Sequence, residues 1–138
     1  MIHFYSESVD FPNIDQELVR RWISSVAKTY GKRVGELTYL FCDDAKILEV
    51  NRQFLDHDYY TDIITFDNTE GKTIAGDLLI SLDTVRTNAI QQGVDYLHEL
   101  HRVIIHGVLH LCGIDDKGPG QREVMEGEED KALRLIVL

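Results

Sequence analysis

The sequence feature that most constrains the fold is an apolar stretch from Val103 to Leu111 that contains two histidines. His106 and His110 stand four residues apart, and isoleucine, leucine and valine occupy most of the remaining positions. An apolar run of this length with helical spacing predicts a buried helix. Because each helical residue turns the chain by about 100°, a four-residue step brings both imidazoles onto one face.

A glycine and two acids follow this predicted helix. Gly113 is expected to end the helix and to return the chain towards the histidine face, where Asp115 and Asp116 come next. Two neutral imidazoles and a third ligand from the following loop are the protein ligands of a catalytic zinc site, which leaves one position for water or substrate. A lone histidine on an apolar face is usually a core residue bonded to a carbonyl group. Two histidines at this spacing, followed by a glycine turn and an acid, favour a metal site.

Length and composition bound the class of protein. The 138 residues, of which 43% are hydrophobic and 28% charged, suit one globular domain over residues 1–138. No apolar run is long enough to cross a bilayer and the N-terminus has no signal pattern, so a cytoplasmic location is expected. The net charge of -10 argues against a broad basic surface for nucleic acid. This net charge does not exclude a local basic cleft, and a bound metal would add positive charge at its site.

Helical and strand patterns alternate along the rest of the chain. Strands are predicted at 2–5, 37–42, 63–66 and 74–80, with the last two joined as a hairpin. Helices are predicted at about 15–30, from a cap at Asp43 or Asp44 through Phe54, from a cap at Ser81 to about Gln92, and at about 95–111 and 121–135. The pattern predicts a single-domain α+β fold: about four strands in a mixed sheet, about five helices, and a metal site at the end of the buried central helix.

Three blocks, in order along the chain, resemble the YbeY family, the metal-dependent endoribonucleases of bacterial ribosomal RNA maturation. The family signature resembles H-G-x-L-H-L-x-G-Y-D-H and stands here as the stretch from His106 to Asp116. A second block, N-x-x-Y-R-x-x-D-x-P-T-D-V-L-S-F, is similar to residues 51–66, and a third, G-D-I-x-I-S, to residues 76–81. The resemblance covers about Leu37 to Glu128.

The resemblance implies a zinc-dependent endoribonuclease that cuts single-stranded precursor RNA in 16S ribosomal RNA 3′-end maturation and ribosome assembly. It implies one Zn²⁺ ion at a catalytic site formed by His106, His110 and a third ligand. It also implies partners in the small ribosomal subunit and an assembly GTPase. The family's third ligand is a histidine, whereas this chain has Asp116 at the same spacing. A carboxylate binds zinc at about the same bond length, so Asp116 is expected to remain a ligand, with Asp115 as the alternative.

A second departure from the family falls at Leu55, where the family carries an arginine linked to RNA binding. Leucine cannot neutralise a phosphate group. Arg52 lies about one helical turn earlier and is expected to bind the RNA substrate instead. Tyr59 and Tyr60 either stack on unpaired bases or simply pack against the protein.

The sequence leaves the general base and two other functions open. Gly107 stands where metallopeptidases with an H-E-x-x-H motif carry their base, which disfavours a peptidase. Asp62, Asp77 and Asp115 are candidates for the base, and each has an alternative as a turn or cap residue. The favoured function is the endoribonuclease. The two departures from the family support the alternative of a non-catalytic ribosome-assembly factor that retains the fold.

Overall fold

Four strands form one mixed sheet in the computed structural model, which describes residues 1–55 and 61–136. The strands are β1 (Ile2–Ser6), β2 (Arg33–Cys42), β3 (Ile63–Asp67) and β4 (Thr73–Ser81), in the spatial order β1-β2-β4-β3. The pairs β1·β2 and β2·β4 are parallel, and β3·β4 is the predicted antiparallel hairpin. The predicted mixed sheet is therefore confirmed. Tyr59 and Tyr60 lie outside the described residues.

Within the described residues, five helices pack around the sheet, as the sequence predicts. They are α1 (Gln16–Thr29), α2 (Asp44–Phe54), α3 (Leu82–Gln92), α4 (Tyr96–Leu111) and α5 (Gln121–Leu135). The side chains of Asp15, Asp43 and Ser81 accept hydrogen bonds from backbone amides in the first turns of α1, α2 and α3, which fixes where these helices begin. None of the helices in the described ranges has the length and apolar character needed to cross a bilayer.

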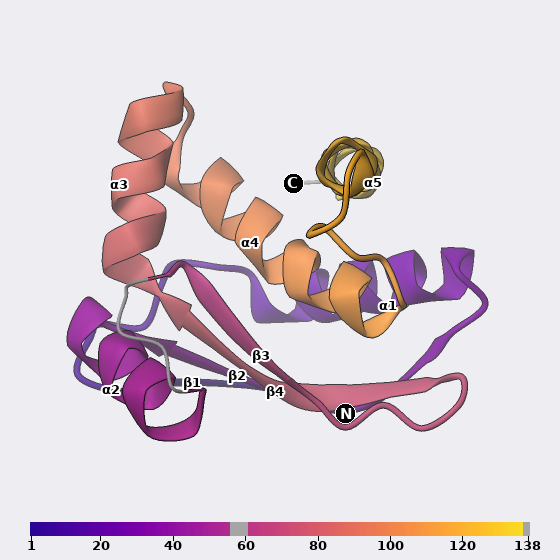
Figure 1. Ribbon diagram of the computed structural model, residues 1–138, viewed down its shortest axis with the longest axis horizontal. Helices are drawn as coiled ribbons and strands as arrows, with labels where there is room; N and C mark the ends of the chain where they lie inside the picture. The colour runs from indigo at the N-terminus through magenta and orange to yellow at the C-terminus, as the bar shows by residue number, and fades with distance from the viewer. Residues whose placement is uncertain (56–60, 137–138) are drawn as a thin grey trace.

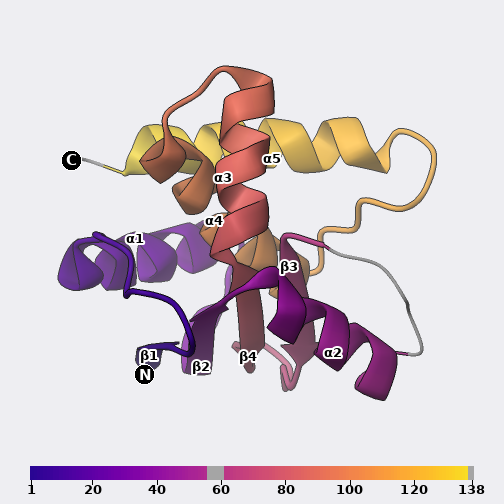
Figure 2. The same ribbon diagram turned by 90° about the vertical axis from the view of Figure 1, so that its left-hand side faces the viewer.

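The helices pack on the sheet in layers (Figures 1 and 2). Helices α1 and α4 cover one face, and α5 lies outside them, farther from the sheet. Leu78 and Ile80 of β4 are fully buried in the main core, which also contains the apolar face of α4. Leu79, whose side chain points to the other face, packs with Ile47 and Val50 of α2 in a smaller core. Because its apolar face lies in the main core, α4 is the buried central helix that the sequence predicts.

Strand β2 is longer than its apolar pattern indicates. It begins at Arg33 instead of Leu37, and its register against β4 shifts between Val34 and Leu37. The extra residues pair with the start of β4, where Arg33 lies opposite Thr73. This pairing is made by the backbone, so a pattern of side-chain polarity does not reveal it.

Helix α4 lies close against the sheet at Gly107. A Cβ atom at this position would overlap the side chain of Leu78 in β4 and come within 3.0 Å of the side chain of Ile63 in β3. The glycine therefore lets α4 lie against both strands of the hairpin. This contact turns the neighbouring His106 away from the sheet and towards α5.

Candidate metal centre

The C-terminal end of α4 presents two imidazoles side by side. The ring centroids of His106 and His110 are 4.5 Å apart, and their planes are nearly perpendicular, at 85°. After the helix, Gly113 has a φ angle of 101°, and its amide donates to the carbonyl of His110 at 2.9 Å. This left-handed residue turns the chain back across the end of the helix, which brings Asp116 to the histidines.

The three side chains together have the spacing of a metal site. Oδ2 of Asp116 lies 3.4 Å from Nε2 of His106 and 3.6 Å from Nε2 of His110. A tetrahedral site with bonds of about 2.0–2.1 Å has ligand atoms about 3.3 Å apart, so these separations fit one bound ion. Among the described residues, these three form the only group of three or more histidine, cysteine or acidic side chains close enough to share a metal ion.

The two adjacent acids after α4 have different surroundings. Asp115 is exposed, and its Oδ1 accepts hydrogen bonds from the amides of Asp116 and Lys117 at 2.7 and 3.2 Å. These backbone hydrogen bonds lower the pKa of Asp115 and hold its side chain in the turn. Asp116, not Asp115, faces the imidazoles.

The ring of His106 is held from behind by a buried acid of α5. Its Nδ1 lies 2.6 Å from Oε2 of Glu129, which is only 6% exposed. The other oxygen of Glu129, Oε1, accepts from Nη1 of Arg102 at 2.7 Å. Burial lowers the pKa of His106, but the hydrogen bond and charge of Glu129, with the charges of Asp62 and Asp116, outweigh burial and raise it.

His110 has a different electrostatic environment. Burial and the neighbouring charge of His106 lower its pKa, and the charge of Asp116 and a backbone hydrogen bond at Ile114 only partly offset them. A lowered pKa keeps the imidazole neutral near pH 7. Neutral imidazole is the form that binds a metal ion.

The three side chains line a large cleft with a volume of about 1290 Å³. Among its described lining residues, eight are acidic and three are basic. The basic residues are Arg102, Lys117 and Arg122. Leu55 lines this cleft, whereas Arg52 lies exposed on α2 and is not among the described lining residues.

The structure separates the candidates for the general base. Asp62 lines the cleft, and burial raises its pKa, although the charge of His106 and two backbone hydrogen bonds lower it in part. Asp77 is exposed on β4 between the buried residues Gly76 and Leu78. Because neighbouring strand residues point to opposite faces and Leu78 points to α4, Asp77 points away from the cleft.

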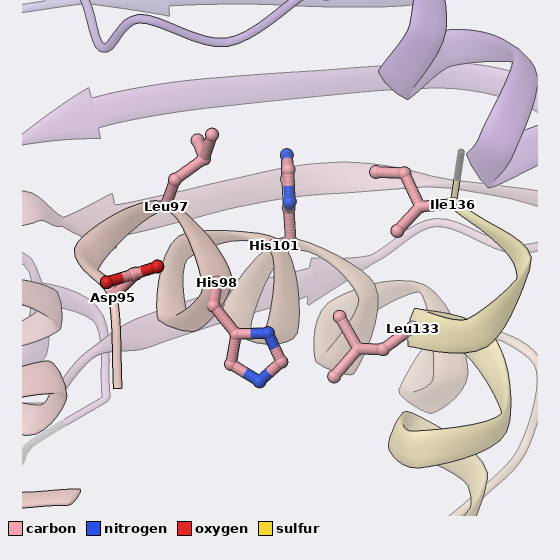
Figure 3. A pocket seen from close by; sticks show the side chains of 6 residues that line it. All are labelled: Asp95, Leu97, His98, His101, Leu133 and Ile136. Carbon is pink, nitrogen blue, oxygen red and sulfur yellow. The ribbon is translucent and has the colours of Figure 1, made fainter. Parts of the chain in front are cut away.

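A second pocket, of about 330 Å³, lies near the other end of α4 (Figure 3). His98 and His101 of α4 and Leu133 of α5 are among its lining residues. The rings of these two histidines point in different directions (Figure 3). The described side chains here do not form a group that could hold a metal ion.

Sequence reasoning missed Glu129, which contacts the ring of His106, and Arg102, which contacts Glu129. A signal for Glu129 exists in the spacing of α5, where Met125, Glu129 and Ala132 form its buried stripe. An acid on an apolar stripe needs a buried partner. Arg102 stands four residues before His106 and so lies on the same face of α4. Neither signal indicates that the two helices dock against each other.

The family model described as Endoribonuclease YbeY matches residues 2–136. The chain belongs to this family. A relative from Phocaeicola vulgatus, named Endoribonuclease YbeY, is 64% identical over 138 residues, which are all of this chain and all of the relative. A relative of the same name from Parabacteroides distasonis is 62% identical over 135 residues, or 98% of this chain and 95% of the relative.

One solved structure supports the fold independently. The solution structure of TM1509 from Thermotoga maritima matches with a TM-score of 0.68 and 24% sequence identity. The match covers 99% of this chain and 89% of the other. At this identity the likeness concerns the fold alone.

Proposed function

We propose that this YbeY family member is a zinc-dependent endoribonuclease that cuts single-stranded RNA. The observation that supports it most is the spacing of Nε2 of His106, Nε2 of His110 and Oδ2 of Asp116, within a family whose described activity is endoribonucleolytic. Resemblance to the family further suggests 16S ribosomal RNA 3′-end maturation in the cytoplasm, with the small ribosomal subunit and an assembly GTPase as partners.

The charge of the cleft supports metal dependence. Among the described lining residues, eight acidic side chains against three basic ones repel a phosphodiester, so the protein alone attracts RNA poorly. When bound, a divalent ion supplies Lewis acidity and a water molecule of lowered pKa. The ligand set of two imidazoles and one carboxylate fits zinc, and it carries one more negative charge than three histidines.

The protein side chains then have distinct roles. His106, His110 and Asp116 hold the ion, and Arg102, Lys117 and Arg122 are the basic residues among the described lining of the cleft. Asp62 is the candidate that accepts a proton from the attacking water, because it lines the same cleft and its pKa is raised. Arg52 is proposed to bind RNA outside the described cleft lining.

The geometry disfavours a metallopeptidase of the H-E-x-x-H type. In such enzymes the residue after the first histidine supplies the base. Here that residue is Gly107, and it faces β3 and β4 so closely that a Cβ atom would overlap Leu78. A side chain at this position would start against these two strands.

A cleavage assay with metal analysis tests the proposal. Protein loaded with zinc should cleave a single-stranded RNA oligonucleotide, a chelator should abolish cleavage, and casein should stay intact. Asp116→Ala should lose both zinc and cleavage, whereas the matched control Asp77→Ala, on the other face of the sheet, should retain both. Zinc binding without cleavage would overturn the endoribonuclease in favour of the assembly factor.

Arg52 is tested with the same substrate. Arg52→Ala should raise KM for RNA with little change in kcat, because the residue is proposed to bind substrate and not to react. Arg134→Ala, which removes another exposed arginine near the end of a helix, is the control. Equal KM values for Arg52→Ala and the parent would contradict the assignment.

A further inference from the structure

We infer that Arg102 and Glu129 are positioning residues that fix the orientation and the tautomer of His106. Glu129 lies between the two, with one carboxylate oxygen on each. The inference rests on the proposed function, because it concerns how the protein prepares His106 to bind metal.

The first step concerns the proton on the ring of His106. A carboxylate only accepts hydrogen bonds, so the 2.6 Å contact with Oε2 of Glu129 places a proton on Nδ1. In the neutral ring, the lone pair is then on Nε2, the nitrogen that lies 3.4 Å from Oδ2 of Asp116. Metal-binding histidines commonly donate their other N–H in this way, and the partner raises their basicity.

The second step concerns Glu129 itself. Glu129 lies on α5, far in sequence from α4, and its side chain is buried. The direction of its carboxylate therefore depends on the side chains that bind it. Arg102 does so with Nη1 at 2.7 Å from Oε1 of Glu129 and with Nη2 at 3.1 Å from Oδ1 of Asp130. The planar guanidinium group thus contacts two successive residues of α5 in a fixed geometry.

The surroundings of Arg102 restrict the orientation of its guanidinium group. Its side chain is only 23% exposed, and it lies about one helical turn before His106 on the same face of α4. Its Nε is 3.9 Å from Oε1 of Glu99, which is also buried, and neither atom has a hydrogen-bond partner among the described residues. Arg102 therefore sits among three carboxylates, and its contacts with α5 decide where Glu129 points.

Glu129→Gln is the sharpest test, because an amide cannot satisfy both neighbours. If its oxygen accepts from Arg102, its NH₂ group faces Nδ1 of His106 and favours a proton on Nε2. If its oxygen accepts from His106, the NH₂ group faces the guanidinium donors of Arg102 instead. In either orientation one contact of the chain Arg102–Glu129–His106 is lost.

The first measurement needs no metal. Long-range ¹H–¹⁵N spectra of the metal-free protein, recorded above the titration range of imidazole, should show the Nδ1–H tautomer of His106 in the parent. Glu129→Gln should shift the population towards Nε2–H. The control Glu128→Gln removes the neighbouring acid of α5, which accepts instead from the hydroxyl of Tyr30, and should leave the parent spectrum unchanged.

The second measurement is zinc affinity by competition with a chromophoric chelator. Glu129→Gln should weaken binding by about 10–100-fold, as is typical when a metal-bound histidine loses its partner. Arg102→Gln should weaken it too, and Arg102→Lys should recover part of the loss, because lysine keeps a cation beside Glu129 but cannot contact both acids. The Glu128→Gln control should bind like the parent, and circular dichroism should show all variants folded.

The outcomes separate this inference from the proposed function. A parent that binds zinc, with unchanged affinity and an unchanged His106 tautomer in Glu129→Gln, would overturn the inference and leave the metal site intact. A parent that fails to bind zinc would overturn both. A shift in tautomer together with the loss of affinity supports the positioning role.

Discussion

The hydroxyl group of Tyr39 donates a 2.9 Å hydrogen bond to the backbone carbonyl of Ile104, which joins the middle of the sheet to the helix that carries both histidines. Tyr39 lies in β2 and is fully buried, and burial raises its pKa far above the usual range. Ile104 stands two residues before His106. The bond therefore helps to set the height of α4 above the sheet and the place of the imidazoles.

Replacing Tyr39 by phenylalanine tests this contact. We expect Tyr39→Phe to lower the free energy of unfolding by about 0.5–1.5 kcal/mol, the usual net contribution of one hydrogen bond. Urea denaturation followed by circular dichroism measures it. Tyr5→Phe is the matched control, because Tyr5 is 56% exposed and its change should stay within about 0.5 kcal/mol. Equal effects in the two variants would contradict the structural role of the bond.

The positions of the helices followed from local signals in the sequence. Asp15, Asp43 and Ser81 accept hydrogen bonds from the backbone of their own first turns, and such contacts depend only on residues nearby. The two histidines of α4 are four residues apart on one apolar helix, so their proximity also followed from local geometry. Features of this kind need no knowledge of the tertiary fold.

What could not be predicted depends on how distant segments dock. The contact between Glu129 and His106 spans 23 residues and exists only because α5 packs against α4. The face of the sheet to which Asp77 points follows from its neighbour Leu78, whose side chain lies against Gly107 of α4. That contact is known only from the folded structure. Asp62 lines the cleft because β3 begins beside α4, which its own sequence does not indicate.

Gly113 offers a second test of how the site is built. Gly113→Ala should cost about 1–2 kcal/mol, because a side chain is unfavourable at its φ of 101°, and no neighbouring atom lies within 4 Å to add to the cost. Since this turn returns Asp116 to the histidines, zinc affinity should fall as well. Equilibrium unfolding and chelator competition measure the two effects.

Gly127 is the matched control for that substitution. It lies inside α5, no atom would meet a Cβ within 4 Å, and its backbone is helical. Gly127→Ala should therefore raise the free energy of unfolding by about 0.5–1 kcal/mol, the helix preference of alanine over glycine. Loss of stability in Gly127→Ala, or none in Gly113→Ala, would show that the backbone argument is wrong.

The two thiols should be unreactive in the folded protein. Burial raises the pKa of Cys42 to about 12 and that of Cys112 to about 11. Only the thiolate reacts, so at pH ~8 both should react with Ellman's reagent more than about 100-fold more slowly than in urea, where a thiol has a pKa near ~8.5. Rapid reaction of one thiol without denaturant would place that cysteine at the surface.

His101 should make the stability of the protein depend on pH. Its side chain is 2% exposed and packs edge-on against Trp22 at 5.6 Å, in the wall of the smaller pocket (Figure 3). Burial, and to a lesser degree the charge of His98, lower its pKa from the ordinary value of 6.5. Above pH 6.5 the His101 ring is neutral in both the folded and the unfolded protein, so it does not change the free energy of unfolding with pH. As the pH falls below 6.5, the unfolded chain binds a proton at His101 while the folded protein does not. Stability is therefore lost until the pH falls below the lowered pKa of His101 in the folded protein.

The variant His101→Gln isolates this contribution. His106 has a raised pKa and acts with the opposite sign, so the comparison must be a difference between parent and variant. Between pH ~7.5 and ~5.5, the free energy of unfolding should fall more in the parent than in His101→Gln. Proton NMR should show the His101 ring titrating below 6.5. An equal fall in both proteins, or a His101 ring that titrates at or above 6.5, would contradict a buried neutral imidazole beside Trp22.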